Sequence, residues 1–149
     1  MKLSFLLPIA IFATIVACNQ PQNTSTSSSQ TSTTTEPKDS GVYFVNLKNG
    51  DTVKSPVIVQ MGVKGKTVVP MGTLDMKTGH HHLIIDGNFT EKGQIVNKDS
   101  THLHFGKGQT VDTLKLSPGA HTLTLQFADG VHQSYGKDWS NTITIIVKQ

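Results

Sequence analysis

The segment HTLTLQF, residues 121–127, alternates strictly between polar and apolar side chains. A period of two is that of a β-strand with one face in the core. The segment NTITIIV, residues 141–147, follows the same pattern. Both segments are short and are bounded by turn-forming residues, so they predict two strands of an antiparallel sheet.

Further apolar or alternating runs lie on either side of these two segments. Turn residues (Gly, Pro, Asn or Asp) bound each run, and no window keeps a helical spacing for more than a turn or two. About seven short strands in about a hundred residues predict an all-β, immunoglobulin-like antiparallel sandwich. A small Greek-key barrel is the alternative. The additional runs are residues 42–45, 56–63, 82–86 and 111–116.

The beginning of the chain has the features of a secretory signal. Lys2 precedes a nearly continuous apolar stretch over residues 3–16, too short for a transmembrane helix, which needs about 20 apolar residues. The stretch ends in Ala17-Cys18, which resembles the lipobox of bacterial lipoproteins. We therefore predict a signal peptide over residues 1–17 and acylation of Cys18. The alternative is an incidental buried cysteine. The chain has 1 Cys, so it forms no intramolecular disulfide.

The next stretch is polar. Residues 19–40 contain no aliphatic side chain and cannot bury enough apolar surface to offset their chain entropy. We predict that residues 18–40 form a lipidated, disordered linker and that residues 41–149 form one domain. The partner of acylated Cys18 is then membrane lipid. Asn19, in place of an aspartate after the cysteine, favours the periplasmic side of the outer membrane by resemblance to other lipoproteins.

The charged residues argue against several functions. The formal net charge is +3, and all 13 basic residues are lysine. Nucleic-acid recognition relies heavily on arginine, so we do not expect a nucleic-acid partner. The chain has no candidate Cys nucleophile, no G-x-S-x-G and no H-E-x-x-H motif, and Asp86, Asp129 and Asp138 are isolated. We therefore predict no catalytic residue and no enzyme, although a histidine-bound metal with an open position would still permit chemistry.

Histidines are concentrated in the predicted domain, which holds all 7 of them. On a strand, residues i and i+2 point to the same face, so an H-x-H pair is suited to chelation. If Leu83 and Leu103 face the core, then the even-numbered histidines beside them face away from it. Pairing of these two strands would bring four imidazoles together as a copper or zinc site. These primary candidates are His80, His82, His102 and His104.

His81, His121 and His132 are secondary candidates. His121 shares a face with the apolar residues of 121–127, so we expect a partly buried histidine hydrogen-bonded to backbone. His132 lies in a loop and is either a ligand or exposed. The ordinary alternative for the whole set is a solvated, polar sheet face. Without cysteine ligands in the domain, a finger-type structural zinc site is excluded. Thioethers favour Cu(I), but scattered methionines, here Met61, Met71 and Met76 before the first cluster, are more often core filler.

Four motifs resemble those of a bacterial family of small secreted domains, DUF4399, a domain of unknown function. They are VYFVNLKNGD (42–51), GHHHLIIDG (79–87), HLHFGKGQT (102–110) and PGAHTLTLQFADG (118–130). The resemblance extends over residues 41–149. It implies secretion and the extent of the domain, and it supplies no activity.

Two functions follow from these observations. The first is a membrane-anchored module in the cell envelope that binds copper or zinc for scavenging, delivery or buffering. It predicts histidine nitrogens within about 4–5 Å of one another. The second is a non-catalytic scaffold or adhesion module for a protein or glycan, which predicts dispersed histidines and an exposed apolar patch. Trp139 and Tyr135 are the only sequence hint of such a patch, and Trp139 is more often a core residue. The sequence does not identify a protein partner.

Overall fold

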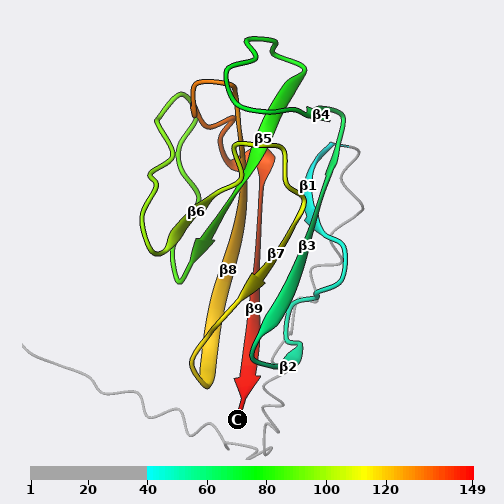
Figure 1. Cartoon of the computed structure of the whole chain (residues 1–149), viewed down its shortest axis with the longest axis vertical. Coiled ribbons are helices and arrows are strands. Elements are labelled where there is room, and N and C mark those ends of the chain that lie inside the picture. Colours follow the sequence, from blue (N-terminus) through cyan, green and yellow to red (C-terminus); the bar gives the residue numbers. More distant parts are fainter. Residues whose placement is uncertain (1–39) are drawn as a thin grey trace, which may run out of the picture. The chain divides into compact units, whose positions relative to one another are not determined.

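The computed structural model describes residues 40–149, which form two β-sheets packed face to face (Figure 1). The predicted signal peptide, Cys18 and nearly all of the predicted linker lie outside the described residues. No helix in residues 40–149 is long and apolar enough to cross a membrane. The strands are β1 (Gly41–Phe44), β2 (Thr52–Lys54), β3 (Val57–Lys64), β4 (Thr67–Val68), β5 (Thr78–Ile85), β6 (His102–His104), β7 (Val111–Leu114), β8 (Gly119–Ala128) and β9 (Ser140–Lys148).

The larger sheet has six strands in the order β2-β9-β8-β5-β4, with β6 also paired to β5. The long strands β8 and β9 pair antiparallel along its centre, and β5 lies antiparallel on the other side of β8 (Figure 1). The smaller sheet has the order β1-β3-β7 and is antiparallel throughout. Only the short pairings of β2 with β9 and of β4 with β5 are parallel among the described strands.

The core lies between the sheets and follows from the alternating pattern. In β8, Leu123, Leu125 and Phe127 are fully buried, and they meet Val59 of β3 and Ile145 of β9 in one apolar cluster. The all-β antiparallel sandwich predicted from the sequence is confirmed. Residues 40–149 contain nine strands where about seven were expected. The additions include β2 and β4, with 3 and 2 residues, which are too short to show a period.

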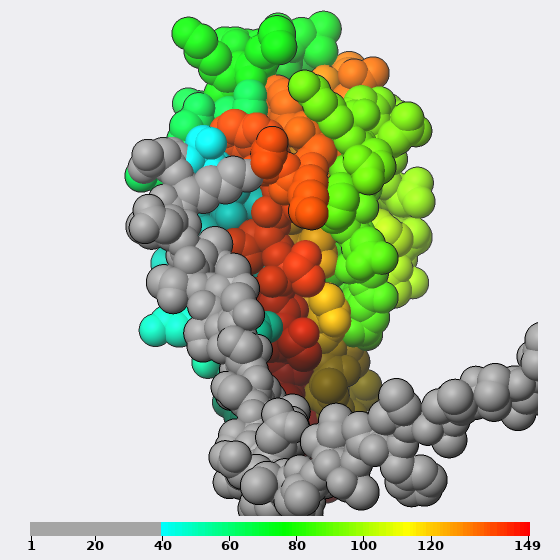
Figure 2. Space-filling model, turned by 180° about the vertical axis from the view of Figure 1, so that it is seen from behind, coloured from blue at the N-terminus to red at the C-terminus, as the bar shows by residue number. Residues whose placement is uncertain are grey.

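The outer face of the larger sheet is covered as well. Ile84, Thr124 and Gln126 point away from the core and are nevertheless fully buried. Two connections, residues 86–101 and 129–139, which we call the cover segments, lie over this face. Figure 2 shows the lime-green atoms of the first beside the orange atoms of the second.

Hydrogen bonds fix the cover segments to the sheet and to each other. The Gln126 side chain accepts from the Thr90 N–H and donates to the Gly136 carbonyl. Ile95 and Gln133 form an antiparallel bridge between the two segments. The outer face of these strands is thereby removed from water, while the Gln126 side chain keeps hydrogen-bond partners.

Candidate metal centre

The even and odd positions of β5 have different surroundings. His81 faces the core, where its ring meets Phe127 edge-on with centroids 5.1 Å apart. His80 and His82 are on the other face, beneath the cover segments. Both are 0% exposed. The alternative of a solvated, histidine-rich face is therefore wrong for His80 and His82, because irregular connections without a readable period fold over them.

The register between β5 and β6 decides which histidines meet. His82 is opposite His104, and Ile84 is opposite His102. Directly opposed residues in an antiparallel pair have Cβ atoms about 5 Å apart, so the His104 ring lies beside that of His82, at 5.0 Å between centroids. His102 shares this face but lies two residues, about 7 Å, farther along the strand.

His102 is consequently not placed with the other primary candidates. Its Nδ1 lies 2.9 Å from Asp99 Oδ1, and the same carboxylate oxygen accepts from the backbone N–H of His102 and from that of Thr101. The expectation that His102 converges with the other three is corrected. The alternating pattern predicted the correct sheet face for His102. The strand register, however, places His102 beside Asp99, a carboxylate in the turn before β6.

His132, a secondary candidate, is the fourth histidine whose ring meets the others. It lies in the second cover segment, in a turn shaped by Asp129, whose Oδ1 accepts from the N–H groups of Val131 and Gln133. His132 has φ +68°, a left-handed conformation uncommon for residues other than glycine. The Val96 N–H bonds to its carbonyl oxygen and helps to hold it there. Backbone strain of this kind is concentrated at functional sites.

We define the histidine cluster as His80, His82, His104 and His132. Its Nε2 atoms meet in two pairs: His80 and His82 at 3.1 Å, and His104 and His132 at 3.0 Å. Ligand nitrogens of His80, His104 and His132 all lie within 4.8 Å of one another. Nitrogens bound tetrahedrally at 2.0–2.1 Å would be roughly 3.3–3.4 Å apart. Small side-chain shifts therefore suffice for several of these imidazoles to bind one ion.

Three imidazoles of the cluster, those of His80, His82 and His104, have lowered pKa values. Burial, together with the neighbouring His104 and His132, lowers the pKa of His80 to about 4. Burial also lowers the pKa of His82, as does the charge of the nearby histidines. The pKa of His104 is lowered for the same reasons, burial first and His132 second. Neutral imidazole is the form that binds metals.

The ring nitrogens that point away from the cluster are poorly satisfied. Nδ1 of His80 and Nδ1 of His82 are buried and have no hydrogen-bond partner among residues 40–149. An unsatisfied buried polar atom costs about 1–3 kcal/mol.

Gly106 makes room for the cluster. If the β5–β6 register is continued, Gly106 lies opposite His80. A Cβ atom at Gly106 would be 2.4 Å from His104 Nε2, which real contacts do not allow. Because Gly106 has no side chain, the His104 ring folds over the backbone toward His80, and their centroids lie 5.0 Å apart. Sequence reasoning did not identify Gly106, although its place two residues after H-L-H is a signal.

The remaining secondary candidates have structural surroundings. His81 lies in the core, and neither of its ring nitrogens has a hydrogen-bond partner among the described residues. His121 is partly buried, as expected. Its Nδ1 is 2.9 Å from Asp86 Oδ2, and its Nε2 is 3.0 Å from the Ser117 carbonyl oxygen. The hydrogen bond that His121 donates to Asp86 raises the pKa of His121.

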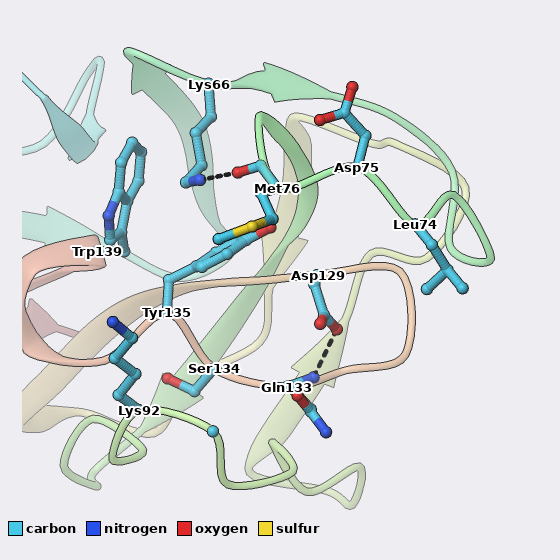
Figure 3. A pocket seen from close by; sticks show the side chains of 11 residues that line it. Lys66, Leu74, Asp75, Met76, Lys92, Asp129, Gln133, Ser134, Tyr135 and Trp139 are labelled. Carbon is cyan, nitrogen blue, oxygen red and sulfur yellow. Dashed lines mark hydrogen bonds between the residues drawn. The ribbon is translucent and has the colours of Figure 1, made fainter.

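A separate pocket of about 470 Å³ lies beside the second cover segment (Figure 3). Tyr135 and Trp139 form its aromatic wall. Lys66 Nζ lies 3.9 Å from the Tyr135 ring centroid and 4.7 Å from that of Trp139, and it donates to the Met76 carbonyl. The aromatic wall therefore already holds a cation of the protein itself. Trp139 also packs against the core.

Comparisons with known proteins supply a family and no activity. Residues 59–148 match the family described as domain of unknown function (DUF4399). The match begins at Val59, so the motif at 42–51 lies outside it. No curated protein matches the sequence. Among solved structures, the endo-beta-1,4-mannanase from Thermotoga petrophila is similar at 17% identity and a TM-score of 0.44. The alignment covers 78% of this chain and 21% of the mannanase chain.

Proposed function

The chain belongs to the DUF4399 family, whose description names no activity, and we propose from the histidine cluster that it binds one copper or zinc ion. The observation that carries the proposal is the meeting of four imidazole Nε2 atoms in two pairs 3.1 and 3.0 Å apart. Imidazole nitrogen is a good ligand for both metals. The ligands come from three separate segments of the chain, so the fold preorganises them.

The arrangement of the cluster supports uptake of an ion from solution. His80 and His82 are fully buried at its base, whereas His104 and His132 are partly exposed. The exposed pair can receive the ion first, and the buried pair then completes the coordination. A protein that binds and releases a metal in this way serves scavenging, delivery or buffering.

The convergence also favours metal binding over the scaffold alternative. That alternative expected dispersed histidines that respond to pH while exposed to solvent. The cluster is instead compact, with His80 and His82 buried beneath the cover segments, and the pKa values of His80, His82 and His104 are lowered. An exposed sheet that only contacts a partner has no need of four convergent imidazoles.

We also propose that acylated Cys18 anchors the protein in the cell envelope, at the periplasmic side of the outer membrane. Residues 1–18 carry this proposal through the apolar stretch and the lipobox-like Ala17-Cys18. Several acyl chains on one residue provide a stable anchor. Labelling with radioactive palmitate tests it: the label should appear in the membrane fraction and be lost in Cys18→Ser.

Calorimetric titration with Zn(II) and Cu(II) tests the metal site. The full chain should be used with Cys18→Ser, because a free thiol is itself a metal ligand. We expect one ion per chain with sub-micromolar affinity. The triple variant His80→Ala, His104→Ala, His132→Asn should lose this binding, and asparagine at 132 tolerates the left-handed backbone.

The matched control removes two histidines outside the cluster. The double variant His102→Ala, His121→Ala should bind both metals as the parent does. The proposal would be contradicted if the parent chain bound these metals more weakly than an isolated pair of surface histidines does. So would equal loss of binding in the control and in the cluster variant.

A further inference from the structure

The connection between β4 and β5 reaches the histidine cluster. The Met71 N–H bonds to the Gly106 carbonyl at 2.9 Å, and the Gly72 N–H bonds to the Gly130 carbonyl at 2.8 Å. Gly106 closely follows His104, and Gly130 closely precedes His132. The connection is therefore fastened to both of the segments that supply the partly exposed histidines.

The Met71 side chain lies at this edge of the cluster. A Cβ atom at Gly106 would be 2.4 Å from His104 Nε2 and 3.0 Å from Met71 Sδ. The thioether sulfur and the imidazole nitrogen therefore border the same small space. The distance between Met71 Sδ and His104 Nε2 cannot exceed the sum of these two distances. Met71 is 53% exposed. The residue thus lies at a solvent-exposed edge of the cluster.

The resulting donor set is soft and neutral. Thioether sulfur selects Cu(I) among the metals that imidazole also binds. The group of convergent ligands found among the described residues contains no carboxylate, and imidazole and thioether bind metals as uncharged donors. Burying an ion without a compensating charge is costly, and the penalty grows with the charge of the ion. A single positive charge suits this site better than a double one.

We propose that the histidine cluster is a copper site that binds Cu(I), with Met71 as its thioether ligand. This inference rests on the proposed function and adds the metal, its oxidation state and a fifth residue. The sulfur would contact the ion at the solvent side, together with His104 and His132.

Met76 provides a matched control on the same connection. It is 83% exposed and lines the separate Lys66 pocket (Figure 3). Replacement of either methionine by leucine removes the sulfur, keeps a similar volume and leaves the core intact. Only Met71→Leu should alter the copper site.

The test is a competition titration of Cu(I) against a chromophoric chelator under anaerobic, reducing conditions. The full chain carries Cys18→Ser, so that a sulfur ligand can come only from methionine. We expect Met71→Leu to weaken Cu(I) binding at least about 10-fold and to change Zn(II) binding less than about 3-fold. Met76→Leu should leave both affinities unchanged. X-ray absorption of the Cu(I) complex should show a sulfur neighbour that disappears in Met71→Leu.

The possible failures are distinguishable. Equal Cu(I) affinity in the parent and in Met71→Leu, with no sulfur neighbour in the absorption spectrum, would overturn the role of Met71. The proposed metal site would still stand if the chain bound Zn(II) or Cu(II). Tight Zn(II) binding without Cu(I) binding would overturn the copper assignment. Binding of none of these ions would overturn the proposed function as well.

Discussion

His102 and His121 each turn Nδ1 to a carboxylate, at 2.9 Å from Asp99 and from Asp86 respectively, whereas each imidazole of the histidine cluster turns Nε2 to another imidazole. The first arrangement holds one proton between two groups and fixes a turn. In the second, each hydrogen bond holds one proton between two imidazoles, with no carboxylate as the partner. Histidines of one small sandwich thus differ in what their nitrogens face, and we propose metal binding only for the second group.

The largest expected effect separates these two groups directly. His80→Ala removes a fully buried ligand at the base of the cluster and should weaken metal binding about 100-fold or more, equivalent to about 2.7 kcal/mol. His102→Ala, on the same sheet face, should change it less than about 3-fold. Titration calorimetry of both variants measures the difference. Similar losses in the two variants would contradict the distinction.

A second prediction concerns the space beside the cluster. Gly106→Ala places a methyl group where the His104 ring lies, 2.3 Å from its Cε1 atom. The ring must rotate away from His80, so metal affinity should fall about 10-fold, or 1.4 kcal/mol. Urea unfolding in the absence of metal controls for a general loss of structure. Unchanged affinity with an unchanged fold would mean that the His104 ring position is unimportant.

A third prediction concerns the core face of β5, where a substitution should raise stability rather than lower metal affinity. His81 is buried against Phe127 with both ring nitrogens unpartnered among the described residues. His81→Leu replaces these polar atoms with an apolar side chain, so the free energy of unfolding should rise by about 1 kcal/mol. Metal affinity should be unchanged. Chemical denaturation and calorimetry check the two parts. Loss of metal binding would place His81 in the site.

The smallest effect is expected at the pair of His121 and Asp86. The hydrogen bond between them raises the pKa of His121 above 6.5 and lowers that of Asp86 below 3.8, although burial of Asp86 opposes the second shift. The raised His121 pKa gives stability that is present below pH 6.5 and lost as pH rises through the folded value. The lowered Asp86 pKa gives stability that is present above pH 3.8 and lost as pH falls.

The pair therefore stabilises the domain most between about pH 4 and pH 6.5. Asp86→Asn keeps an acceptor for Thr122 and tolerates the positive φ of this residue. Because Asp86 is half exposed, the variant should lose only about 0.5 kcal/mol at pH 5.5 and less at pH 8.5. Urea titrations at both pH values measure this. A larger loss at pH 8.5 would contradict the assignment.

The sequence contains most of the fold but only part of the site. The alternation in 121–127 and 141–147 depends on local side-chain spacing, so β8, β9 and the core face were predictable. The faces of His80, His82 and His104 follow from the same period of two. The exclusion of His102 depends on strand register, which is set by partner strands far away in sequence.

Two features of the site have no periodic signal. His132 joins the cluster because a turn built on Asp129 holds it in a left-handed conformation, and such turns leave only weak traces in sequence. The burial of His80 and His82 comes from the cover segments, which are irregular. Hydrogen bonds such as that from Thr90 to Gln126 fix these segments, and they connect residues that no spacing rule relates.

The most direct test of the central claim is a crystal structure of the chain grown with copper or with zinc, with diffraction recorded at the absorption edge of the metal. We predict one strong anomalous peak among the Nε2 atoms of His80, His104 and His132, within about 2.0–2.1 Å of each bound nitrogen. Bound metal beside His102 and Asp99, or beside His121 and Asp86, with none at the histidine cluster would contradict the account.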